Sequence, residues 1–98
     1  MSVGSKHKAR EWLERAVKLA PDYPENHLSL IEARIKWNDQ AGAQRELTLL
    51  DTLWPDAQSI FAGEAWERSW NEWSTRRDAA RKELDESVAP SKPPKTSR

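Results

Sequence analysis

The segment that decides the fold occurs twice: AREWLERAVKLAPD stands at residues 9–22, and AQRELTLLDTLWPD stands at residues 43–56. The two copies lie 34 residues apart and share five identical residues in fourteen positions. The identical pairs are Ala9 and Ala43, Leu13 and Leu47, Leu19 and Leu53, Pro21 and Pro55, and Asp22 and Asp56. A sequence that repeats at a fixed period of this length predicts stacked copies of one helical unit.

Both copies have the apolar spacing of a helix with one buried face. The stripe of the first copy consists of Ala9, Leu13, Ala16 and Ala20, and that of the second consists of Ala43, Leu47, Leu50 and Trp54. Each helix is expected to end at its proline, because proline lacks the backbone N–H that would continue the helix. Ser5 and Asp39 are expected to cap the first turns of the two helices.

The segment between the copies, residues 24–37, is predicted to form a helix that neighbouring helices cover on two faces. Its apolar residues lie on more than one side of a helix, and Pro24 suits the first helical turn. Asn38 then makes a tight turn into the second copy. Residues 24–54 are therefore predicted to form a helical hairpin.

The chain after the second copy is predicted to form one long helix, residues 57–86, and a break near Ser74 is the alternative. Its stripe contains Trp66, Trp70 and Trp73. Residues 1–5 are expected to be a flexible N-terminus. Residues 88–98, which are rich in proline and lysine, are expected to be a disordered and mildly cationic tail.

A helix–turn–helix unit of 34 residues resembles the tetratricopeptide repeat (TPR) family. The resemblance covers about residues 6–57, with one full unit at residues 24–57. The positions that match the family's repeat are Leu30, Ala43, Leu47 and Pro55, with Ala9 and Pro21 in the preceding half-unit. Three positions depart from it: His27, Arg34 and Leu50 stand where the family prefers Trp, Tyr and Ala.

The resemblance implies an all-α, TPR-like helical hairpin solenoid fragment of about four helices, spanning residues 6–87. Residues 6–20 would be the second helix of a unit whose first helix is missing. Residues 57–86 would be a long C-terminal capping helix, because the end of a solenoid needs a polar outer face. A stack this short would expose a helix face at its N-terminal edge.

Composition agrees with a small helical core and excludes several classes of protein. Leu, Ile, Val and Phe together number only 16, but six Trp and twelve Ala supply further apolar surface. Basic and acidic residues both number 16, so net charge gives no general attraction to nucleic acid. The chain has no Cys for a disulfide or a zinc–thiolate site. It also shows neither a signal peptide nor an apolar run of membrane length, so we expect a cytoplasmic protein without a membrane partner.

The sequence indicates no catalytic site, no metal site and no cofactor. His7 and His27 are 20 residues apart, and no nucleophile elbow, phosphate loop or paired metal-ligand motif is present. His27 is expected to be a packing residue where the hairpin opens. We therefore expect a protein that is not an enzyme.

The TPR resemblance implies that a protein or peptide binds the concave face of the first helix of the unit. Carried onto this chain, that face consists of Glu25, Leu28, Glu32, Ile35 and Lys36. Family members that grip a peptide carboxylate have a Lys and an Asn where Leu28 and Glu32 stand here. A groove in this chain would instead prefer apolar or basic segments.

Two surfaces remain open to more than one interpretation. Trp73 is expected either to be a core residue or to be a partly exposed anchor for a partner, since Trp is favoured at binding hot spots. Trp12, Leu13 and Val17 are expected to form a self-association surface, which predicts a homodimer or docking on a larger partner. The alternative function is a small helical protein that holds an apolar or aromatic molecule at the Trp cluster.

Overall fold

The computed structural model describes residues 2–88 and is helical throughout that range, with no strand. The helices are α1 (Ser2–Leu19), α2 (Pro24–Lys36), α3 (Gln40–Ile60) and α4 (Glu67–Val88), and a 3₁₀ turn, η1 (Glu64–Trp66), precedes α4. The prediction of an all-α fold with about four helices is therefore confirmed. Within this range, no helix is both long enough and apolar enough to cross a membrane.

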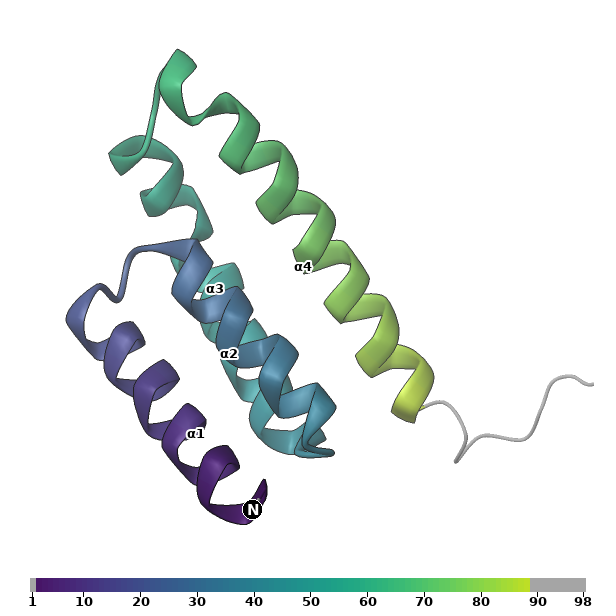
Figure 1. The fold of residues 1–98 in the computed structure, drawn as a ribbon. Coiled ribbons are helices and arrows are strands. Elements are labelled where there is room, and N and C mark those ends of the chain that lie inside the picture. Colours follow the sequence, from purple (N-terminus) through teal and green to yellow (C-terminus); the bar gives the residue numbers. More distant parts are fainter. Residues whose placement is uncertain (1, 89–98) are drawn as a thin grey trace, which may run out of the picture.

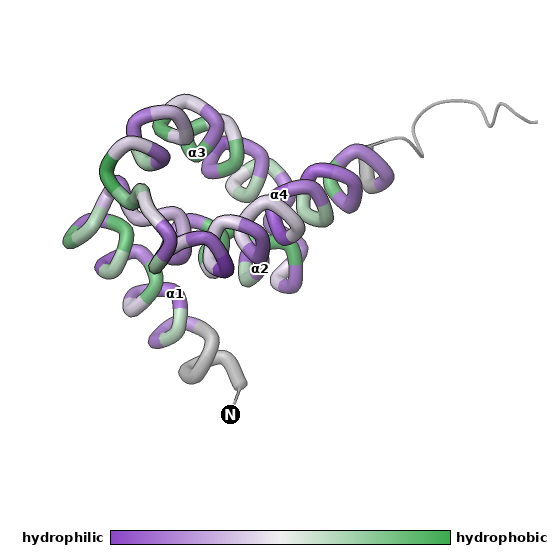
Figure 2. The backbone as a smooth tube through the Cα atoms, turned by 90° about the horizontal axis from the view of Figure 1, so that it is seen from above, coloured by the Kyte–Doolittle hydropathy of each residue, from purple (hydrophilic) through white to green (hydrophobic). Residues whose placement is uncertain are grey.

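Helix α2 lies at the centre of the array. It packs against α1, α3 and α4, and α4 also packs against α3. Figure 1 shows α1 at one edge and α4 at the other, and the view from above in Figure 2 keeps α2 between them. The prediction that neighbours cover the middle helix on more than one face is confirmed.

The core is built from three helices. Its buried residues are Leu28 and Ile31 of α2, Ala43, Leu47, Leu50 and Trp54 of α3, and Trp73, Ala80 and Leu84 of α4. Leu30 of α2 is also buried, at 2% exposure. Helix α1 adds no buried side chain among residues 7–19, and its stripe, which includes Ala9, is only half-buried.

The turn between α2 and α3 is short because Asn38 adopts a left-handed conformation and Asp39 caps the next helix. Asn38 has φ 66°, a left-handed value that asparagine tolerates better than most residues. The Asp39 carboxylate then accepts a hydrogen bond of 3.1 Å from the backbone N–H of Gly42, which confirms the predicted N-cap. A Cβ atom at Gly42 would collide with the Asp39 and Arg34 side chains, so the cap needs glycine there.

The prediction that the second copy ends at Pro55 is wrong, because α3 continues through Pro55 to Ile60. Pro55 is exposed, whereas Trp54 and Ala57 on either side of it are buried and extend the core stripe. Burial of Trp54 and Ala57 on the core side of the helix offsets the missing backbone hydrogen bond. In the first copy, α1 does end before Pro21, at Leu19. The next helix, α2, then begins at Pro24.

Other predicted boundaries also shift. The capping helix begins at Glu67 instead of residue 57, after a link at Gly63 with φ 109°, a value that favours glycine. Helix α4 is continuous, so the alternative break near Ser74 is wrong. Helix α1 begins at Ser2, before the expected cap at Ser5 and within the segment expected to be flexible. The predicted tail lies outside the described residues from residue 89 onward.

Replacing Pro55 with alanine tests the continuous α3. Alanine restores a helical N–H and removes the proline ring, so the free energy of unfolding should rise by about 1–3 kcal/mol, as measured by urea denaturation. Pro21→Ala is the matched control, because Pro21 lies outside the helices, and it should change stability by less than about 1 kcal/mol. A Pro55→Ala variant no more stable than this control would contradict the continuous helix.

Candidate functional site

The face of α2 that the TPR resemblance assigns to a ligand lies against α4. The Glu25 carboxylate accepts hydrogen bonds from the Trp73 indole N–H at 3.1 Å and from the Arg76 guanidinium at 2.8 Å. The Glu32 carboxylate accepts two further bonds from Arg76, at 2.9 and 2.8 Å. One arginine of α4 therefore joins two acidic residues on the same face of α2. Its guanidinium suits this arrangement because it can donate several hydrogen bonds at once.

Electrostatics reinforce this contact. Burial raises the pKa of the Glu25 carboxyl, but the hydrogen bonds from Trp73 and Arg76 lower it more, and its pKa falls below the ordinary value. The same two carboxylates raise the pKa of Arg76, whose guanidinium therefore stays charged. In the folded chain, Glu25 and Glu32 therefore bind side chains of α4.

The remaining residues of this face differ in exposure. Leu28 is fully buried and belongs to the core, and Ile35 is partly buried against it. Lys36 is exposed. Glu32, Ala33, Ile35 and Lys36 line a groove of about 480 Å³ with Glu83 of α4. The structure thus brings the five predicted residues to one face but leaves only its C-terminal end open.

The opposite flank of α4 is fixed to α3 by two more arginines. The Arg77 guanidinium lies 3.9 Å from the centre of the Trp54 ring and 3.5 Å from the Asp51 carboxylate. Arg81 donates two hydrogen bonds of 2.8 Å to the same carboxylate. Cation–π and ion-pair contacts of this kind hold α4 across both α2 and α3.

The Trp cluster is part of the protein interior. Trp73 is 2% exposed, and its ring centre lies 4.8–6.4 Å from those of four other aromatic side chains. These four neighbours are Tyr23, Phe61, Trp66 and Trp70. Trp70 also donates its indole N–H to the Phe61 carbonyl at 2.6 Å. Three of the four contacts of Trp73 are edge to face and the one with Trp66 is tilted, so the cluster has the geometry of a packed core.

His27 is a buried polar residue that the hairpin encloses completely, at 1% exposure. Its Nδ1 lies 2.5 Å from the Glu46 carboxylate of α3, and its Nε2 lies 2.6 Å from the Pro21 carbonyl in the turn after α1. Both partners are acceptors, so both ring nitrogens must carry a proton. Burial lowers the pKa of His27, but Glu46, the Pro21 carbonyl and Asp22 raise it more, and its pKa lies above the ordinary 6.5.

Helix α1 presents a largely uncovered face. Trp12 is 68% exposed and Leu19 is 79% exposed, and they lie seven residues apart on one side of the helix. Leu13 and Val17, the other members of the predicted self-association surface, are half-buried. We call Trp12 and Leu19 the α1 edge. The sequence pointed to Trp12 as part of a self-association surface, but it did not point to Leu19.

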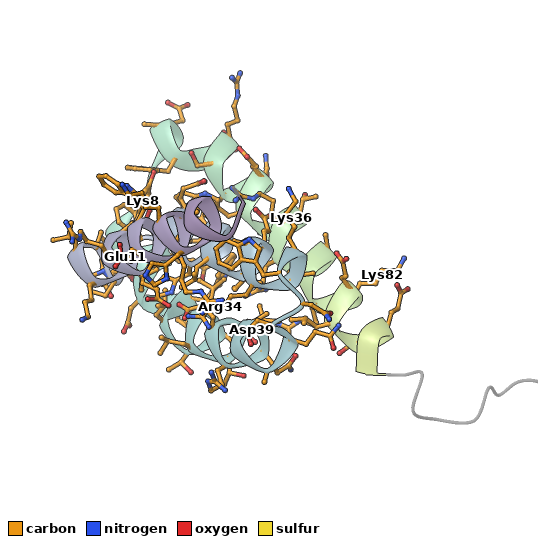
Figure 3. All side chains as sticks on the ribbon, turned by 60° about the horizontal axis from the view of Figure 1, so that its bottom comes forward. Lys8, Glu11, Arg34, Lys36, Asp39 and Lys82 are labelled. Carbon is orange, nitrogen blue, oxygen red and sulfur yellow. The ribbon has the colours of Figure 1, made fainter. Side chains whose placement is uncertain are left out.

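Helix α1 is held to the hairpin by polar contacts. Arg34 of α2 bridges Glu14 of α1 and Asp39, each at 3.0 Å, and Figure 3 shows Arg34 between α1 and the start of α3. Asn26 donates to the Ala16 carbonyl at 3.1 Å. Arg10 lies over the Trp37 ring at 5.3 Å. This attachment leaves the α1 edge facing away from α2.

The described residues contain no group of three or more histidine, aspartate or glutamate side chains that could hold a metal ion. Comparison with models of protein families, with curated proteins and with solved structures gives no match for this chain. The candidate site is therefore defined by its surfaces alone. The α1 edge carries the two most exposed large apolar side chains, ahead of Ile60 at 54% and Leu49 at 49% on α3.

The Arg76 contact predicts a specific loss of stability. Arg76→Met keeps the apolar stem but leaves Glu25 and Glu32 without their charged donor, so the free energy of unfolding should fall by about 1–2 kcal/mol in urea denaturation. Arg68→Met on the exposed part of α4 is the control and should change it by less than about 0.5 kcal/mol. Equal effects of the two substitutions would show that the contact to α2 contributes nothing.

The His27 contact predicts that stability falls with rising pH. The folded-state pKa is raised above 6.5, so the contribution of His27 is fully present below pH 6.5 and is lost as the pH rises through the folded-state pKa. The difference in unfolding free energy between the wild type and His27→Gln should therefore be larger at pH 6 than at pH 9. An NMR titration of the His27 ring that gives a pKa below 6.5 would refute this.

Proposed function

We propose that this chain is a non-enzymatic, TPR-like protein interaction module that binds a protein partner through the α1 edge. The order of packing supports the repeat arrangement. A hairpin of α2 and α3 has α1 on one side and α4 on the other, which is the order of helices in a stack of paired helices.

The observation that carries the proposal is the contrast between the two ends of the array. The exposed positions of α4 are mainly polar, including Glu72, Asp78, Lys82 and Glu86, and Figure 2 colours most of α4 hydrophilic. The α1 edge instead exposes Trp12 and Leu19. Large apolar side chains left in water at one end of a stack, with a polar face at the other, favour a partner at the apolar end.

The proposal places the partner at α1 and not on the concave face of α2. Glu25 and Glu32 already bind Arg76, and Leu28 is buried, so a ligand there would have to displace α4. Displacing α4 would also remove Trp73, Ala80 and Leu84 from the core. Trp73 is buried and the rings around it are half-buried against one another, which gives no support to a small-molecule site at the Trp cluster.

A photo-crosslinking amino acid placed at position 12 tests the proposed function. In the cells that make the protein, the variant should form a covalent adduct with a protein, and the adduct should disappear when Leu19 is also changed to Asp. The same crosslinker at Lys82, on the polar face of α4, is the control. Adducts that are absent at position 12, or equally abundant at position 82, would reject binding through the α1 edge.

A further inference from the structure

We propose that the partner of the α1 edge is α1 of a second copy of this chain, packed antiparallel about a two-fold axis between Arg15 and Ala16. This inference rests on the proposed function and specifies the partner. Trp12 and Leu19 are symmetric about that axis, so each Trp12 lies opposite Leu19 of the second copy. A contact of this kind uses the same surface on both copies and closes after two.

Small residues beside the apolar pair allow the helices to approach. Ala9 and Ala16 lie on the side of the stripe nearer α2, and both are half-buried there. Ala16 falls at the crossing point, where a larger side chain would separate the two backbones. Trp12 can then cover the alanine surface of the second copy as well as its Leu19.

Charge complementarity decides the direction of packing. The other flank of the edge carries four charged residues of α1, spaced three, four and three residues apart: Lys8, Glu11, Arg15 and Lys18. An antiparallel copy reverses this order, so Glu11 of each copy meets Lys18 of the other. Arg15 lies near the axis and faces Arg15 of the second copy, which is the one pair of like charges. Parallel packing would instead place this flank against the side of the second copy that carries Ala9 and Ala16, so Glu11 and Lys18 would gain no charged partner.

These charges are free to pair in this way. The Glu11 side chain is 64% exposed, and its contact with His7, at 3.7 Å, is a surface pair along the same helix. Lys8, Arg15 and Lys18 are all exposed as well, and Figure 3 shows Lys8 and Glu11 on α1.

The alternative of head-to-tail stacking has no support from the far end of the array. Across residues 67–86 the exposed positions of α4 are polar apart from Ala79, so this face offers little apolar surface to Trp12 of another copy. The α1 edge is also short, so the interface falls below the roughly 1,200–2,000 Å² of stable complexes. We therefore expect a reversible dimer with a dissociation constant on the order of micromolar to tens of micromolar.

Sedimentation equilibrium on the full chain tests the pairing. The wild type should dimerise as its concentration rises to about 500 μM, and Trp12→Ala should weaken the dimer at least about tenfold. Glu11→Lys and Lys18→Glu should each weaken it, and the double variant E11K/K18E should restore it, because the charges then pair in the opposite sense. Lys82→Glu on α4 should have no effect, and circular dichroism should show the same helix content in every variant.

The outcomes separate this inference from the proposed function. Single variants without effect, or a double variant that stays as weak as the singles, would overturn the antiparallel register. A wild type that remains a monomer throughout would overturn the second copy as partner. The proposed function would then still stand if position 12 crosslinks to a different protein, and it would fail if position 12 crosslinks to none.

Discussion

Trp73 and Glu25 stand 48 residues apart in the chain, and the hydrogen bond between them fixes the helix that completes the core. The indole ring of Trp73 fills the space over α2, while its N–H satisfies a carboxylate that would otherwise be costly to cover. Arg76 then neutralises that carboxylate and Glu32 together. Once α4 is in this position, Ala80 and Leu84 reach the core, and α2 is covered on three sides.

The asymmetry of the molecule follows from that arrangement. Helix α4 buries apolar and paired side chains inward and leaves a polar surface outward, so the array is closed at that end. Among the described residues, α1 packs against α2 alone and is held largely by polar bridges. Its apolar residues therefore fall into two groups that differ in exposure. Leu13 and Val17 are half-covered, whereas Trp12 and Leu19 remain in water. An open end of this kind is the physical basis of the proposed interaction.

His27 connects the open end to the core. Its ring is buried and makes two hydrogen bonds, one with the Glu46 carboxylate and one with the Pro21 carbonyl. The turn that positions α1 is thereby linked to α3 through a protonated side chain.

The sequence by itself determined the helical class, the hairpin of α2 and α3 and the Asp39 cap, because apolar spacing, turn residues and capping act within a few neighbouring residues. It also identified Trp12 and the residues of the α2 face. Only the tertiary structure decided that α3 passes through Pro55, that Arg76 and Trp73 occupy that face, and that Leu19 is exposed. Each of these depends on which distant side chains supply burial or charge, and a local pattern carries no information about partners half the chain away.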